Sequence, residues 1–136
     1  MFIDEINHDI EKIFDSSFQA KYCQMILDYI VTNSCAVGME FTYLSFSRIL
    51  ELHVISSELI EAVNFLSGSK WKVLDVHFSF IDEDDKDYEI SKGEVREALI
   101  TGVFIHPLTG SIVKDSLKNI IAYFTPSTEF ISKVCR

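Results

Sequence analysis

The sequence predicts an α+β fold with a helical core and a small antiparallel β-sheet. Residues 4–14 and 17–32 repeat their apolar side chains every three or four positions, which is typical of amphipathic helices. Residues 71–81 instead alternate apolar and polar side chains, which indicates an antiparallel strand buried on one face. At 136 residues, 48% of them hydrophobic, the chain is long enough for one domain with its own core.

The first half of the chain predicts four helices. The expected apolar face of the first consists of Ile3, Ile6, Ile10, Ile13 and Phe14. That of the second consists of Phe18, Tyr22, Met25, Ile26, Tyr29 and Ile30. Ser45 or Ser47 is expected to cap a short third helix, and Ser56 a fourth with Leu59, Ile60, Val63 and Leu66 inside. Gly68 suits the left-handed position that commonly ends a helix.

The second half mixes strands and helices. An acidic loop at 82–87 is expected to follow the strand at 71–81. Ser91 and Glu94 then match the capping-box pattern, which predicts a helix with Val95, Ala98 and Leu99 inside and its end at Gly102. A hairpin is expected at 103–113. Residues 116–124 fit either a helix or a strand, and a short helix is expected over 128–135.

Residues 41–113 resemble a winged helix-turn-helix domain in the order of their elements and the spacing of their apolar residues. In the single domain that we expect over 1–136, residues 1–34 would be a helical pair, 41–113 the winged-helix-like core, and 114–136 a C-terminal element. The resemblance implies DNA binding through the helix at 57–65. Its outward positions, however, include Glu58 and Glu61, and only Ser57 and Asn64 are suited to contacting bases.

The charge distribution favours a protein partner over nucleic acid. The formal net charge is −9, and residues 81–97 contain eight acids and three bases, a net charge of −5. Phosphate contacts by Lys and Arg supply most sequence-independent DNA affinity, so this segment would repel a duplex. Basic protein surfaces are attracted to it instead.

The leading hypothesis is therefore a non-enzymatic protein–protein interaction module, a small acidic accessory or regulatory subunit. One form of it is an antitoxin-like or immunity-like protein that masks a basic partner. The candidate contact residues are Asp82, Glu83, Asp84, Asp85, Asp87, Glu58, Glu61 and Trp71. Trp71 is included because tryptophan is enriched at binding hot spots. The N-terminal helices either pack in the core or form a homodimer interface.

Two alternatives use other residues. A DNA-binding regulator would need to gather Arg48, Lys70, Lys72 and Lys114 on one face. An enzyme could use Asp75 to orient His77, because both lie on the polar face of the predicted strand. A simpler interpretation is that these are two polar residues on a solvated sheet face.

Several classes of function lack their sequence signals. The chain has no nucleophile elbow, P-loop or dinucleotide fingerprint. The histidines and the three cysteines (Cys23, Cys35 and Cys135) lack metal-site spacing, so we expect no metal and no cofactor. The N-terminus lacks a signal-peptide pattern, and no apolar run reaches the roughly 20 residues of a membrane span. We therefore expect a cytoplasmic protein.

Overall fold

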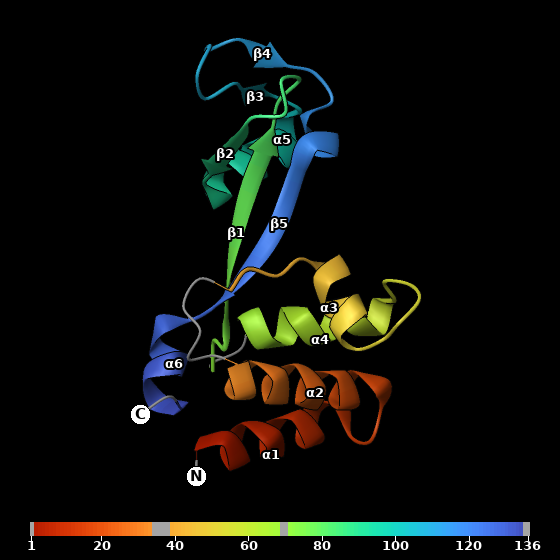
Figure 1. Cartoon of the computed structure of the whole chain (residues 1–136). Helices are drawn as coiled ribbons and strands as arrows, with labels where there is room; N and C mark the ends of the chain where they lie inside the picture. The colour runs from red at the N-terminus through yellow and green to blue at the C-terminus, as the bar shows by residue number, and fades with distance from the viewer. Residues whose placement is uncertain (1, 34–38, 69–70, 135–136) are drawn as a thin grey trace. The chain divides into compact units, whose positions relative to one another are not determined.

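The computed structural model describes residues 2–33, 39–68 and 71–134, and the chain is an α+β protein with 54% helix and 19% strand (Figure 1). The elements are α1 (Phe2–Phe14), α2 (Phe18–Asn33), α3 (Tyr43–Ile49), α4 (Ser57–Gly68), β1 (Leu74–Ile81), β2 (Asp87–Ile90), α5 (Lys92–Thr101), β3 (Phe104–Ile105), β4 (Ile112–Val113), the 3-10 helix η1 (Ser116–Asn119), β5 (Ile120–Pro126) and α6 (Thr128–Val134). The predicted α+β class is confirmed.

The chain divides into two compact units. The first combines Met1–Asp75 with Phe124–Arg136, and the second is Val76–Tyr123. The boundaries fall inside β1 and β5, so they do not coincide with the expected subdivision at residues 34, 41 and 113. That residues 1–136 act as one domain stays a prediction.

Helices α1, α2 and α4 build the core of the first unit, with α2 packed against both of the others. Ile6 and Ile10 of α1, and Leu59, Val63 and Leu66 of α4, are fully buried. The expected apolar faces of α1 and α2 are partly wrong, because Ile13 is 60% exposed and Phe18 is 64% exposed. On α2 the buried residues are Ala20, Cys23, Ile26, Leu27 and Ile30. Because α2 has a neighbour on two sides, packing rather than the number of apolar residues determines which face is buried.

Helix caps were predicted with mixed success. Ser56 accepts the Leu59 N–H at 3.2 Å, as expected. The cap of α3 is Thr42, and the predicted cap Ser45 instead bonds back to the Thr42 N–H in a capping box. Gly68 does not adopt the expected left-handed conformation, because it is the last helical residue of α4 rather than the residue after the helix.

A three-stranded sheet has the order β2-β1-β5, and most of it belongs to the second unit. β1 and β2 are antiparallel, and Ser79 lies opposite Glu89. The predicted strand at 71–81 is confirmed from residue 74 onward, whereas β2 was not anticipated. Sheet residues Phe80 and Ile90 pack against Val95 and Ala98 of α5 and Phe104 of β3.

The remaining elements of this half follow the local signals. Helix α5 begins after Ser91 and ends at Gly102, whose φ is 76°, but Leu99 is 64% exposed rather than buried. The hairpin is confirmed, with Phe104 opposite Val113. Residues 116–124 are partly helix and partly strand, because η1 leads directly into β5. The final helix is α6. Lys70, Cys35 and Cys135 lie outside the described residues.

Candidate functional site

The eight candidate contact residues are divided between the two units. Glu58, Glu61 and Trp71 belong to the first, and the five acids of residues 82–87 belong to the second. Each group is therefore considered by itself. Glu61 and Trp71 line the same groove, and Glu58 lies nearby in the first turn of α4 but does not line it.

The groove lies between α1 and α4 and has a volume of about 900 Å³. Ile13 and Phe14 of α1, Phe65 of α4, and Trp71 supply its apolar lining. Its polar lining consists of Asp9, Lys12, Glu61 and Asn64. A wide, mainly apolar groove with a few polar groups at its margin is typical of a site that accepts a ligand or a peptide.

Contacts between residues far apart in the sequence hold the apolar lining of the groove in place. The rings of Phe14 and Phe65 meet edge to face, with centroids 5.4 Å apart at an angle of 74°. Trp71 Nε1 donates to Asp9 Oδ2 at 2.7 Å, so the indole is fastened to α1. Because this hydrogen bond already fixes the indole, a contact made through it would cost little side-chain entropy.

The polar margin is also ordered. Glu61 Oε2 accepts from Gln19 Nε2 of α2 at 3.2 Å. The Tyr43 hydroxyl donates to Asn64 Oδ1 at 2.7 Å, and burial raises the pKa of this phenol. Asp9 and Glu61 outnumber Lys12, so the groove has an acidic margin.

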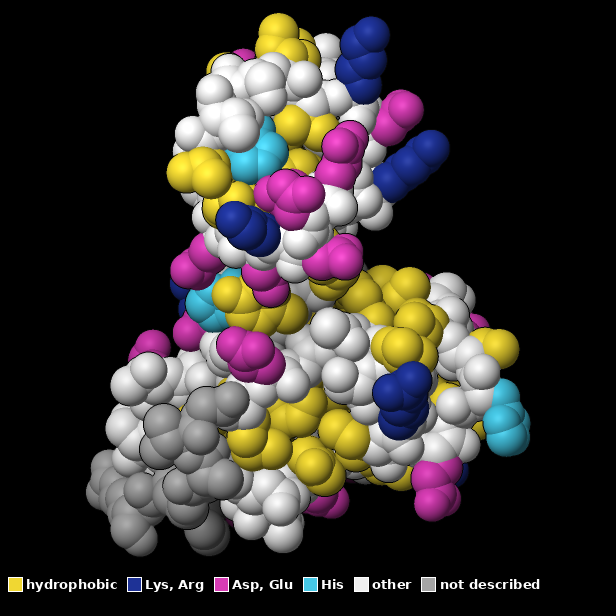
Figure 2. All heavy atoms as spheres, turned by 45° about the horizontal axis from the view of Figure 1, so that its top comes forward, with side chains coloured by type: hydrophobic (Ala, Val, Ile, Leu, Met, Phe, Trp, Pro, Cys, Tyr) yellow, Lys and Arg dark blue, Asp and Glu magenta, His cyan; other side chains and the backbone are white. Residues whose placement is uncertain are grey.

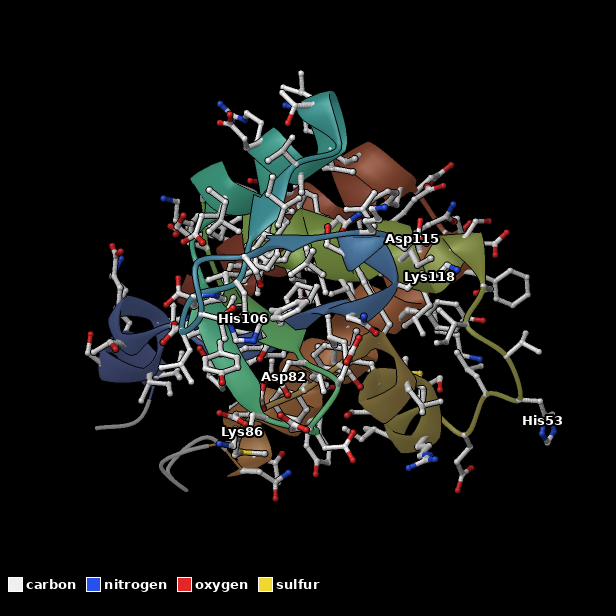
Figure 3. All side chains as sticks on the ribbon, turned by 90° about the horizontal axis from the view of Figure 1, so that it is seen from above. His53, Asp82, Lys86, His106, Asp115 and Lys118 are labelled. Carbon is white, nitrogen blue, oxygen red and sulfur yellow. The ribbon has the colours of Figure 1, made fainter. Side chains whose placement is uncertain are left out.

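The acidic turn between β1 and β2 is organised by Asp82. Its Oδ1 accepts the N–H groups of Asp84 and Lys86, each at 2.9 Å, and its Oδ2 lies 3.2 Å from Nε2 of His106 (Figure 3). The Lys86 N–H, followed by His106 and the Asp84 N–H, lowers the pKa of this carboxyl group, although desolvation opposes them. Desolvation, with the charges of Asp82 and Asp84, raises the pKa of Tyr88.

The other acids of this segment differ in their surroundings. Asp87 accepts a hydrogen bond from Ser79, whereas Glu83, Asp84 and Asp85 are exposed at the tip of the turn. Asp85 has a φ of 60°, a left-handed conformation that aspartate adopts more readily than most residues. Asp82 thus builds the turn, while the three tip residues present its charge to solvent.

For the enzyme alternative, which uses Asp75 and His77, the neighbours of His77 differ from those expected. The His77 ring stacks on Tyr123, with centroids 5.0 Å apart, and its Nδ1 lies 3.7 Å from the Glu89 carboxylate. Asp75 is exposed. Sequence reasoning missed Tyr123 and Glu89 as neighbours of His77, because they come from β5 and from the unanticipated β2.

Exposed aliphatic side chains on the second unit also escaped the sequence analysis. They include Leu99 and Ile100 of α5, Ile105 and Ile112 of the β3–β4 hairpin, and Leu108 in its turn. Figure 2 shows acidic and apolar side chains next to each other on one face of this unit. The alternation in the hairpin could have indicated one outward face, since the directly opposed Ile105 and Ile112 share a side of the ribbon.

Comparison with protein-family models, with curated proteins and with solved structures found no match for this chain. In the part of the chain that the structure describes, no helix has both the length and the apolar character needed to cross a membrane. Among the same residues, no three His, Cys, Asp or Glu side chains are grouped as metal ligands. The site must therefore be interpreted from its own geometry.

Proposed function

We propose that this protein is a non-enzymatic interaction module that binds a basic, amphipathic segment of a partner protein in the groove between α1 and α4. The observation that carries this proposal is the acidic margin of the groove around Ile13, Phe14, Phe65 and Trp71. Amphipathic helices commonly bind by placing apolar anchors at helical spacing into such a groove.

Charge complementarity supports a basic partner. The whole chain has a net charge of −9, and Asp9 and Glu61 flank the apolar lining of the groove. The exposed tip of the β1–β2 turn adds Glu83, Asp84 and Asp85. Long-range attraction would accelerate the encounter, while the apolar lining would supply most of the affinity. A small accessory or regulatory subunit, including one that masks a basic surface, would have these properties.

Trp71 provides a direct test, because it is the only tryptophan in the chain. The probe is a synthetic helical peptide with leucines on one face and lysines on the other. Binding in the groove should shift the Trp71 emission to shorter wavelength, with saturation. A peptide with the same leucines and glutamates in place of the lysines should bind at least about tenfold more weakly, through the loss of charge complementarity.

A pair of variants then assigns the signal to the groove. Ile13→Ser removes a groove side chain that is 60% exposed, so the fold should tolerate it. It should weaken binding about tenfold, since an isoleucine buried by a partner contributes ~1.5–3 kcal/mol. The control Val54→Ser changes an aliphatic residue that is 69% exposed between α3 and α4, and it should have no effect. Equal binding of both peptides, or of both variants, would refute the proposal.

The alternative is a winged-helix DNA-binding protein. In favour of it, α2, α3 and α4 precede a β1–β2 hairpin, and a bridge between Phe41 and Phe124 adds a short strand contact. This order is compatible with a winged-helix-like arrangement. In such a protein α4 would enter the major groove and the β1–β2 turn would be the wing. The acids of that turn make a protein partner the better proposal.

A further inference from the structure

One face of the sheet in the second unit is polar and lies opposite the core. In the β1–β2 register, Ser79 faces Glu89 and Ile81 faces Asp87. Since side chains alternate along a strand, His77, Ser79 and Ile81 share one face with Asp87 and Glu89. The stacking of Tyr123 on His77 extends this face to β5. Elements α5, β3 and β4 of the same unit pack on the other face, around Phe80.

Two flat rings and two carboxylates lie on the polar face. The planes of His77 and Tyr123 are inclined by only 22°, so they form a layered aromatic surface. The Glu89 carboxylate lies at the edge of the His77 ring, and its side chain is 71% exposed. Ser79 is 9% exposed and donates to Asp87, which fixes the position of that carboxylate. None of these described face residues is Lys or Arg.

We infer that this sheet face receives an arginine side chain of the partner protein, a conclusion that rests on the proposed function and specifies the partner further. A guanidinium group stacks on aromatic rings and donates paired hydrogen bonds to carboxylates, whereas a lysine ammonium offers only a point charge. The aromatic layer of His77 and Tyr123 and the acceptors of Glu89 and Asp87 match both properties of arginine.

The test uses N-acetyl-arginine amide as the probe and follows the His77 and Tyr123 ring signals by NMR. The matching lysine amide has the positive charge but no planar end group. The citrulline amide has a planar urea group but no charge. Arginine should move both ring signals and bind at least about fivefold tighter than either analogue, because only arginine combines stacking with charge-assisted hydrogen bonds. Equal binding of lysine, or no movement of the ring signals up to the solubility limit, would overturn the inference.

Matched variants separate this site from general electrostatic attraction. Glu89→Gln should weaken arginine binding about tenfold, the effect of losing one charge-assisted contact. Glu83→Gln removes the same charge from the tip of the turn and should change affinity less than twofold. Equal effects of the two variants would refute a local site. The Trp71 emission reports binding in the groove independently. If the helical peptide shifts that emission but the arginine amide does not move the His77 and Tyr123 ring signals, only the arginine inference is refuted.

Discussion

Asp82 and His106 link the two turns of the second unit. Oδ2 of Asp82 lies 3.2 Å from Nε2 of His106, while Nδ1 of His106 accepts the N–H groups of Leu108 and Thr109 at 3.0 and 3.2 Å. Because Nδ1 is an acceptor, the neutral imidazole carries its proton on Nε2, and this N–H donates a hydrogen bond to Asp82. One side chain therefore fixes the β3–β4 turn and ties it to the β1–β2 turn.

Replacing His106 with Ala should loosen both turns. It removes the acceptor of two backbone N–H groups and the donor to Asp82, so we expect a loss of ~1–3 kcal/mol of unfolding free energy. Hydrogen exchange at Leu108 and Thr109 should become faster, while exchange in α2 should not change. His53→Ala, at an exposed position between α3 and α4, is the control. Unchanged exchange in the hairpin would mean that the imidazole does not organise it.

Acidification should remove the contribution of Asp82 to stability. The pKa of Asp82 is lowered from its ordinary value of 3.8, first by the Lys86 N–H. A carboxyl group with a lowered folded-state pKa stabilises the fold fully above its unfolded-state pKa, and this stabilisation is lost as the pH falls through the lower value.

The Asp82→Asn variant should therefore be less stable than the wild type at neutral pH, and the difference should shrink below about 3.8. Urea unfolding over a pH series from neutral to strongly acidic measures this difference. A difference that stays constant across the series would contradict the assigned role of the ionised carboxylate.

Ser91 should contribute to stability as a helix cap. Its Oγ accepts a hydrogen bond from the Glu94 N–H at 3.1 Å, and Glu94 Oε1 accepts one from the Ser91 N–H at 3.3 Å. Ser91→Ala should lower the free energy of unfolding by ~1 kcal/mol. Ser57→Ala, an exposed serine adjacent to the actual cap of α4, should change it by less. Chemical denaturation of both variants gives the comparison.

The Cys23 thiol should be unreactive toward alkylating reagents in the folded protein. The side chain is fully buried in α2, and burial raises the pKa of its thiol to about 12. Since only the thiolate is nucleophilic, iodoacetamide should label Cys23 only when the protein unfolds. Peptide mapping by mass spectrometry, with and without denaturant, follows this residue separately from the other cysteines. Rapid labelling under native conditions would show that α2 opens locally.

DNA binding should be absent or weak at low salt. In a winged-helix complex the acids of the β1–β2 turn would repel the DNA phosphates, and helix α4 carries Glu58 and Glu61. A gel-shift series with random and genomic DNA measures the dependence on salt. Strong binding whose logarithm falls steeply with the logarithm of salt concentration would instead favour the winged-helix DNA-binding alternative.

Elements with local signals were predictable from the sequence. Helix α5 has Ser91 and Glu94 at its start and Gly102 at its end, so its bounds are encoded within the segment. Strand β2 has no comparable local signal, because its four residues, Asp87–Ile90, become a strand by pairing with β1. The faces of α2 were misassigned for the same reason, since two neighbouring helices determine which side is buried.

The candidate site was predictable only in part. The outward position of Glu61 on the predicted helix and the residue type of Trp71 suggested these two residues, and both line the groove. Of the α1 residues that complete it, Asp9 lies 62 residues before Trp71 and Phe14 lies 51 residues before Phe65, and only tertiary packing brings them together. Asp82 shows the converse: acidic composition suggested a contact residue, whereas its carboxylate is used by the turn and by His106.

The division of the chain makes the second unit an insertion. The chain leaves the first unit through β1 and returns through β5, and these two strands are neighbours in one sheet. An insertion whose two ends lie on adjacent strands can be exchanged for a tight turn with little change in the path of the host segment. Val76–Tyr123 is thus a continuous insertion, and every residue that lines the groove lies outside it.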